Sequence, residues 1–443
     1  MKRRNFLKKA ALTTAASISV PYILPTGRLF ASCGNRVANH VVFVLFAGGI
    51  RQQESVDQQY LANQGLATEG NVMNNMLEGA APTSNLVYQP WSPILNRPLS
   101  QQGTLFKEVL YRQGPTGHYN GHTVAMTGNY TETGLNLNIN PEFPTVFEYY
   151  RRHCDPASSA INAWWISEGL GPYPSLNYSR HQSYGARYGA NYLRPRSIFG
   201  ESGYSQLSGA QTYQPDDVQR ISKIKGLLDQ NFFQQADDLP GIQNTPEDRE
   251  RIKNFLLNSM NAAVTPGGFE FATPGSDPSL LTGDLINISA AWRVMNEFAP
   301  ELTVINTTNL DICHDEFSPY IDFLHRADYG VGWLWNKIQS HPVLANDTIM
   351  ICMPEHGRNL ESNNLRDANG LGAYDHTGDA NSRRVFTLIV GPPDKVVQGQ
   401  VLGSLGNPAA ESIDVVPTIG HILGFEESMG GRVPGRVLNE AFV

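Results

Sequence analysis

The chain has 443 residues, of which 41% are hydrophobic and 17% are charged, and it carries a formal net charge of -8 with a pI near 5.8. This composition is ordinary for a globular protein and excludes a chain that is disordered throughout. The acidic balance argues against nucleic acid or an anionic membrane as the main partner. The length suits one large α/β domain with insertions.

The N-terminus has the pattern of an export signal. Met1 to Lys9 is basic, and the uncharged segment from Ala10 to Pro25 is too short to span a bilayer. Arg3-Arg4-Asn-Phe-Leu-Lys resembles the twin-arginine signal, whose machinery exports folded proteins. We therefore expect residues 1–32 to be a signal peptide and the protein to be periplasmic or secreted. Simple cleavage after residue 31 or 32 is favoured over lipid anchoring at Cys33.

Apart from Cys33, the chain has three cysteines, namely Cys154, Cys313 and Cys352. Their odd number and unrelated spacings predict no disulfide framework. Cys313 and Cys352 lie near the ends of two apolar runs, so a bridge between them and two buried thiols are both open. Buried thiols are the favoured alternative.

Short apolar runs predict the strands of a sheet. The first run, His40 to Phe46, ends in Ala47-Gly48-Gly49, a pair of glycines that allows a tight turn. Further strands are predicted at 103–111, 160–166, 302–306, 348–352 and 385–390, and helices at 216–233, 245–260, 282–298, 323–338 and 414–424. Strands that alternate with helices predict an α/β fold with a doubly wound, mostly parallel sheet. Ligands bind such sheets at the carboxyl ends of the strands.

Two long stretches lack a regular period. Residues 52–102 are rich in polar residues, glycine and proline, which predicts an irregular surface excursion. Residues 173–204 are rich in Tyr and Arg and poor in aliphatic residues, which predicts a loop-rich cap rather than a core strand. Tyr and Arg suit sugars and anionic groups, although irregular surface packing explains them equally well. We expect a domain from 36 to 443 with a loop-rich and helical insertion at about 170–280.

Acidic residues and histidines follow the later predicted strands. They are Asp311, His314, Glu355, His356 and His376. Because each lies soon after an apolar run or before the next one, a parallel sheet would deliver them to one edge. Carboxylates and imidazoles gathered in this way are typical of a metal-assisted ester hydrolase.

A second candidate segment runs from Gly114 to Gly128. A glycine-rich loop that leads into a short helix directs backbone N–H groups toward an anion. Two hydroxyls and two histidines cluster there: Thr116, His118, His122 and Thr123. Solvated loop histidines are the plain alternative to a functional role.

The order of these segments resembles the alkaline phosphatase superfamily, over most of the chain. Residues 103–128 are similar to the nucleophile segment of that family and end in Met126-Thr-Gly128. Asp311 with His314, Glu355 with His356, and His376 follow in the family's order. The C-terminal segments 414–418 and 431–438 are similar to its last helix and tail. The resemblance implies a metal-dependent hydrolase of phosphate or related sulfate esters, with two metal ions about 4 Å apart.

The resemblance also implies metal ligands. Asp311, His314 and His376 would hold the first metal, and Glu355 with His356 the second. These donors suit one or two divalent ions, zinc above all. The sequence departs from the family in two ways. The first motif is Asp-x-x-His, one residue shorter than usual, and Ala47 stands where the family has an Asp after the first strand. Glu54 or Asp57 could swing back to replace that Asp.

The nucleophile is ambiguous at this stage. Counting forward from Phe106 gives Thr116, whereas counting back from Gly128 gives His118. The segment lacks Cys-x-Pro-x-Arg, so the formylglycine chemistry of true sulfatases is not supported. We expect an exported hydrolase acting on a small-molecule or glycan ester, with phosphate esters favoured. The alternative is a catalytically degenerate member that serves as a binding or structural module.

Overall fold

The computed structural model describes residues 34–132, 140–154, 159–168, 175–195, 241–265 and 267–443. Within these ranges nine strands form one mixed, mostly parallel sheet, in the order β4-β3-β5-β1-β6-β7-β2-β8 with β9 paired to β2. The strands are β1 (His40–Phe46), β2 (Gly103–Leu110), β3 (Ala163–Ile166), β4 (Asn191–Leu193), β5 (Leu302–Asn306), β6 (Thr348–Pro354), β7 (Arg384–Val390), β8 (Gln400–Leu402) and β9 (Ala410–Glu411).

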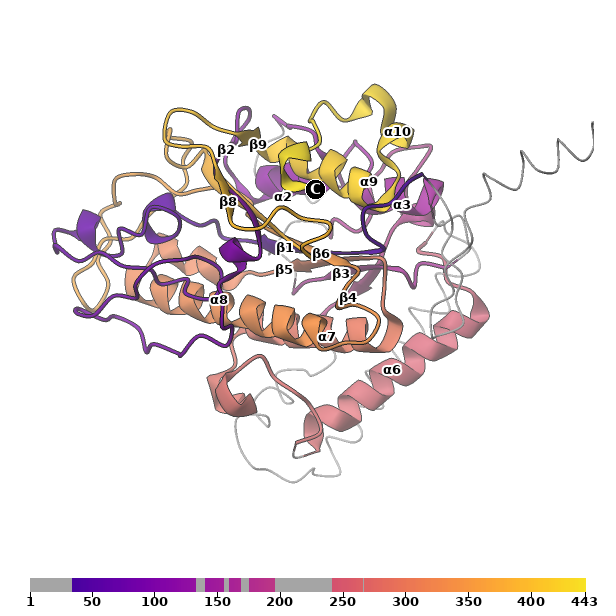
Figure 1. Ribbon diagram of the computed structural model, residues 1–443, viewed down its shortest axis with the longest axis horizontal. Helices are drawn as coiled ribbons and strands as arrows, with labels where there is room; N and C mark the ends of the chain where they lie inside the picture. The colour runs from indigo at the N-terminus through magenta and orange to yellow at the C-terminus, as the bar shows by residue number, and fades with distance from the viewer. Residues whose placement is uncertain (1–33, 133–139, 155–158, 169–174, 196–240, 266) are drawn as a thin grey trace, which may run out of the picture.

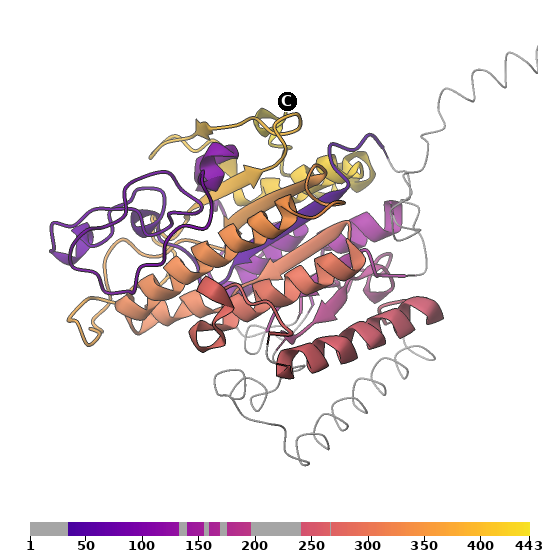
Figure 2. The same cartoon turned by 60° about the horizontal axis from the view of Figure 1, so that its bottom comes forward.

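Helices cover both faces of this sheet (Figure 1). They are α2 (His118–Thr127), α3 (Val146–His153), α6 (Pro246–Val264), α7 (Gly283–Phe298), α8 (Phe317–Gln339), α9 (Val415–Leu423) and α10 (Glu426–Met429). Helices α7 and α8 lie side by side on one face, and α2, α3 and α9 lie on the other (Figures 1 and 2). The predicted α/β architecture is therefore confirmed. No described helix combines the length and apolar character needed to cross a bilayer.

The sequence of strand β1 explains why helices cover both faces of the sheet. Alternate side chains point to opposite faces of a strand. Val42, Val44 and Phe46 accordingly join the core beneath α7 and α8. The intervening residues Val41, Phe43 and Leu45 join the core beneath α3 and α9. A run that is apolar at every position thus marks a central strand buried on both sides.

Helices α6, α7 and α8 follow the sequence signals closely. Thr245 caps α6 by accepting a hydrogen bond from the backbone N–H of Asp248, and Thr282 caps α7 in the same way. The apolar stripe on α8 faces the core, with Ala327, Val331 and Leu334 fully buried. The predicted helix at 216–233 and the signal at 1–32 lie outside the described residues.

Several expectations need correction. Residues 52–102 are irregular, as predicted, but they are not merely a surface excursion, because Tyr60, Val72 and Met76 are fully buried in the core. The Tyr- and Arg-rich stretch supplies the short strand β4, which pairs with β3 at the sheet edge. Cys313 and Cys352 are buried free thiols, as favoured, whereas Cys154 is disulfide-bonded. Irregular spacing therefore did not exclude a disulfide.

Candidate metal centre

The candidate site lies where three neighbouring parallel strands end. Strands β5, β1 and β6 are adjacent, with Leu45 opposite Asn306 and Phe46 opposite Pro354. The loops that follow them carry Gly48, Asp311 and Glu355. Since parallel strands point the same way, their carboxyl ends meet at one edge and bring these loops together.

The turn after β1 requires glycine. Gly48 has φ of 91° and Gly49 has φ of 74°, a region that side chains disfavour. A Cβ at Gly48 would lie 2.2 Å from the backbone nitrogen of Asp311. The predicted role of this glycine pair is confirmed, and the close approach positions the Asp311 loop.

Helix α2 brings His118 to the same edge. The helix begins at His118, so His118 and His122 are helical and do not lie in the preceding loop as predicted. Gly121 permits the approach, because a Cβ there would lie 2.7 Å from the carbonyl oxygen of Glu355. The N-terminus of α2 therefore packs directly on the end of β6.

The imidazoles of three histidines share one hydrogen-bonding pattern, in which Nδ1 is bonded to an oxygen. The Nδ1 atom of His118 lies 2.7 Å from Oε1 of Glu355, and Nδ1 of His314 lies 2.7 Å from Oδ1 of Asp375. Nδ1 of His376 lies 2.6 Å from the carbonyl oxygen of Thr116. Carboxylates and carbonyls accept hydrogen bonds, so each Nδ1 donates and each Nε2 is left for another partner.

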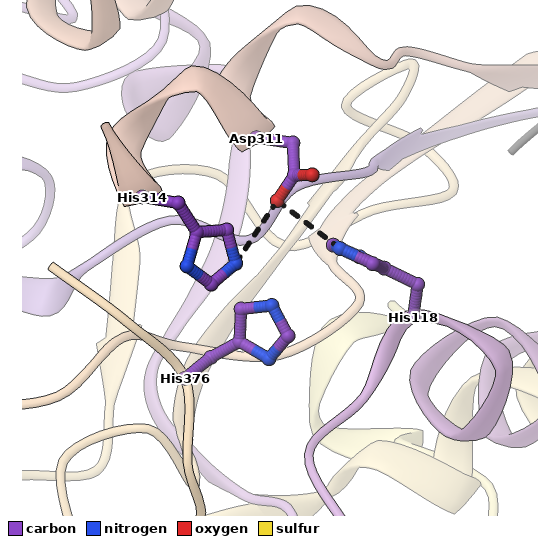
Figure 3. A group of neighbouring side chains, drawn as sticks. All are labelled: His118, Asp311, His314 and His376. Atoms are coloured by element: carbon purple, nitrogen blue, oxygen red, sulfur yellow. Dashed lines mark ion pairs between the residues drawn. The ribbon is translucent and has the colours of Figure 1, made fainter. Parts of the chain in front are cut away.

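These Nε2 atoms gather around Asp311 (Figure 3). Oδ1 of Asp311 lies 3.1 Å from Nε2 of His118 and 3.4 Å from Nε2 of His314. Nε2 of His376 is buried without a hydrogen-bond partner. One ligand atom from each of these four residues lies within 4.8 Å of every other.

This geometry fits a metal ion. Metal-binding histidines usually donate their second ring nitrogen to a carboxylate or a carbonyl, which fixes the tautomer and the ring. His118, His314 and His376 all do so. A buried imidazole nitrogen without a partner is costly unless a cation or water meets it. Three imidazoles with one carboxylate are a tetrahedral zinc donor set.

The electrostatics of the centre are those of a site built for a cation. Burial disfavours charge on His118, but Glu355 and Asp311 outweigh it and raise its pKa to about 10. Burial, with His356 and Arg358 nearby, lowers the pKa of His376. Without a metal, a proton on His118 therefore balances the carboxylates while His376 stays neutral.

A second group shares His118 and adds Glu355 and His356. Nδ1 of His356 donates to the carbonyl of Gly357 at 2.8 Å, and its Nε2 lies 3.3 Å from Oε1 of Glu355. Burial opposes ionisation of Glu355, yet the surrounding histidines hold its pKa well below the usual range. All five predicted metal ligands thus lie in one connected cluster with His118.

Thr116 contacts His376 through two hydrogen bonds. Its hydroxyl donates to the carbonyl of His376 at 2.8 Å and lies 3.5 Å from the hydroxyl of Ser382. The group that faces Asp311 at this end of α2 is His118. In this geometry Thr116 therefore orients His376, and its role as a nucleophile stays a prediction.

The proposed replacements for the missing Asp at Ala47 are wrong. Ala47 is fully buried, and neither of the two nearby acids reaches the centre. Glu54 pairs with the buried guanidinium of Arg51 at 2.6 Å, and Asp57 pairs with Arg384 at 3.2 Å. Both carboxylates neutralise arginines in the fold, so they are not available to a metal.

Three further residues support the centre, and two of them, Arg358 and Asp375, were not singled out in the sequence. Arg358 is fully buried, and its Nη2 lies 3.0 Å from Oδ1 of Asp311. Asp375 orients His314, and His122 lies against Glu355. The only local signals were that Asp375 directly precedes His376 and that Arg358 follows the Glu-His-Gly segment. His122 was noticed in the sequence without a defined role.

This chain is similar to known proteins in structure and not in sequence. No family model matches the sequence, and no curated protein matches it. Solved structures do match. A protein in the alkaline phosphatase superfamily from Vibrio parahaemolyticus is 12% identical, with a TM-score of 0.42 over 100% of this chain and 80% of that one.

Two further matches have described activities. Wild-type alkaline phosphatase PafA is 10% identical, with a TM-score of 0.43 over 93% of this chain and 100% of that one. A phosphonate monoester hydrolase from Silicibacter pomeroyi is 13% identical, with a TM-score of 0.40 over 90% of this chain and 76% of that one. Identities and TM-scores this low transfer no activity to this chain.

Proposed function

We propose that the protein is a divalent-metal-dependent hydrolase of phosphate or related sulfate esters, with zinc as the metal. The observation that carries this proposal is the orientation of the three imidazoles around Asp311, each with Nδ1 bonded and Nε2 turned inward. An ion bound there supplies a Lewis acid and lowers the pKa of bound water.

The chain's own residues have distinct roles in this proposal. His118, Asp311, His314 and His376 hold the ion, while Glu355, Asp375 and the Thr116 carbonyl fix the imidazoles. Arg358 holds Asp311 from the buried side.

The open side of the centre admits the substrate. The side chains of Asp311 and His314 are 46% and 30% exposed, so an ester group can approach them from solvent. We therefore propose a small-molecule ester or an ester group that projects from a glycan as the substrate class.

The direct test is hydrolysis by the zinc-loaded protein. Aryl phosphate, a phosphodiester and an aryl sulfate should be compared, and we expect turnover of at least the phosphate ester. Asp311→Asn and His376→Ala should abolish it. His421→Ala is the matched control, because His421 lies on α9 and pairs with Glu426 away from the centre. Bound metal without turnover of any of the three esters would overturn the hydrolase proposal.

That negative outcome would favour a metal-binding module. A specific observation supports this second candidate: the Thr116 hydroxyl donates to the carbonyl of His376, and it is His118 that contacts Asp311. Four protein ligands are typical of closed structural zinc sites, whereas catalytic sites keep a position open.

Export through the twin-arginine machinery also remains a proposal, since residues 1–33 lie outside the described part of the chain. Support comes from the Arg3-Arg4 pair and the uncharged segment after it. Replacing both arginines by lysine should retain the protein in the cytoplasm if the signal acts, and cell fractionation would measure this. Unchanged periplasmic or secreted protein would contradict it.

A further inference from the structure

We propose that this centre takes one divalent ion, and that Glu355 anchors His118 instead of binding a second ion. The inference rests on the proposed metal site, and it concerns how many ions the site holds. Glu355 is fully buried at the end of β6, and its carboxylate lies between the turn after β1 and helix α2.

Oε1 of Glu355 already has two hydrogen-bond partners in the protein. Oε1 accepts from the backbone N–H of Gly48 at 2.6 Å and from Nδ1 of His118 at 2.7 Å. Oε2 lies against Nδ1 of His122. A second ion at Oε1 would have to displace these two donors and leave their N–H groups unbonded, which costs roughly 1–3 kcal/mol each. Oε2 has no hydrogen bond to lose.

His122 is fixed for this purpose by a chain of buried polar groups. Its Nε2 lies 2.8 Å from Oδ1 of Asn306 at the end of β5. The amide of Asn306 in turn donates to the hydroxyl of Ser167 at 3.0 Å. His122 and Asn306 are fully buried, so this chain sets the position of Glu355 and, through it, the ring of His118.

His118 cannot serve two ions in this arrangement. It is the residue that the two candidate groups share. Its Nε2 faces Asp311, and its Nδ1 is bonded to Glu355. A second ion would therefore be left with Nε2 of His356 and Oε2 of Glu355, both buried without a hydrogen-bond partner, since Ala47 offers no donor atom. Two protein donors are fewer than the three or four that zinc sites have.

Charge also disfavours a second ion. Asp311 and Glu355 are the carboxylates of the two candidate groups, and the guanidinium of Arg358 lies 3.0 Å from Asp311 without solvent exposure. One divalent ion together with Arg358 already outweighs the two carboxylates. A second would add to that excess in a buried setting, where repulsion is strong.

The test is the zinc stoichiometry of the protein. Chelator-stripped protein should be titrated with zinc in a calorimeter, and the dialysed product measured by elemental analysis. We expect one ion per chain in the wild type and in His356→Gln, with affinities within about threefold of each other. Glu355→Gln should still bind one ion but about 10- to 100-fold more weakly, the loss typical of a supporting residue.

The absorption spectrum of the cobalt-loaded protein distinguishes a displaced His118 ring from a general loss of structure. Glu355→Gln and His122→Gln should both shift the cobalt absorption bands, because each releases the ring of His118, whereas His356→Gln should leave them unchanged. Thermal unfolding of the metal-free variants, compared with His421→Ala, identifies any variant that has simply lost its fold. His122→Gln reports on the anchor even if Glu355→Gln fails to fold.

The possible outcomes distinguish the failure of this inference from the failure of the hydrolase proposal. Two ions in the wild type, with one lost in His356→Gln or Glu355→Gln, would overturn this inference and leave the hydrolase proposal standing. One ion without hydrolysis would overturn the hydrolase proposal alone. No bound ion would overturn both.

Discussion

Thr116 and His376 orient each other through two reciprocal hydrogen bonds. Nδ1 of His376 donates to the Thr116 carbonyl at 2.6 Å, and the Thr116 hydroxyl donates to the His376 carbonyl at 2.8 Å. The two residues are 260 positions apart in the chain. This pair couples the segment before α2 to the loop between β6 and β7, and it turns Nε2 of His376 toward Asp311.

The first prediction concerns that pair. Thr116→Val removes the hydroxyl but keeps the shape and the backbone carbonyl. We expect zinc affinity to fall roughly fivefold, the equivalent of one hydrogen bond of about 1 kcal/mol, and Thr116→Ser to restore it. Calorimetric titration measures this. Unchanged zinc affinity with complete loss of turnover would instead assign the hydroxyl to the chemical step.

The second prediction concerns Asp375, which the sequence did not single out. Its Oδ1 lies 2.7 Å from Nδ1 of His314 and also accepts from the side chain of Asn363 at 3.2 Å. Asp375→Asn removes the charge that fixes the His314 ring, so we expect zinc to bind about 10- to 100-fold more weakly. Asp394→Asn, at an exposed position outside the centre, is the control. Equal affinities in the two variants would show that Asp375 does not support the metal.

The parts of the site that sequence could predict are those fixed by local pattern. Apolar runs located β1, β5 and β6, and parallel pairing guarantees that the residues after them meet. Asp311, His314, Glu355 and His356 were identified for that reason, whereas His376 was identified because it precedes the apolar run of β7. The orientation of His118 was not predictable, because it depends on Glu355, 237 positions away in the chain.

The strand at the edge of the sheet could not be predicted from the sequence either. Strand β4 has only three residues, Asn191–Leu193, with a single aliphatic side chain. Its strand conformation is set by pairing with β3 and not by its own composition. The burial of Tyr60 and Met76 is likewise a tertiary effect, because the irregular segment that carries them is folded back over the core. Neither the β4 strand nor the burial of these two residues corresponds to a periodic pattern in the sequence.

The third prediction tests how that irregular segment is attached. Asp328 on α8 is fully buried and accepts hydrogen bonds from the backbone N–H groups of Asn75 and Met76 at 2.9 and 2.7 Å. Asp328→Ala leaves both N–H groups buried without a partner, so the free energy of unfolding should fall by about 2–5 kcal/mol. Urea denaturation measures it, with Glu297→Ala on the exposed side of α7 as the control. A loss no larger than that of the control would contradict the anchoring role.

The fourth prediction is a pH dependence of stability that arises away from the centre. Glu148 on α3 accepts hydrogen bonds from Thr145 and Ser179, and burial raises its pKa from 4.5 to about 7. The folded protein therefore holds a proton on Glu148 that the unfolded chain releases in this range. The contribution of this proton to the free energy of unfolding is complete below pH 4.5 and is lost as the pH rises through about 7.

Glu148→Gln cannot titrate, so it isolates this effect. The free energy of unfolding of the wild type, relative to Glu148→Gln, should fall by up to about 3 kcal/mol as the pH rises across that window. Urea denaturation of both proteins at several pH values measures the difference. A difference that does not change with pH would mean that the hydrogen bonds keep Glu148 ionised throughout.

The central claim is that His118, Asp311, His314 and His376 bind one metal ion. X-ray absorption spectroscopy of the zinc-loaded protein tests it most directly, because it reports the number and type of ligands. We predict three imidazole nitrogens and one carboxylate oxygen at about 2.0–2.2 Å, with one imidazole lost in His118→Ala. A spectrum with two imidazoles in the wild type, or one unchanged in His118→Ala, would contradict the account.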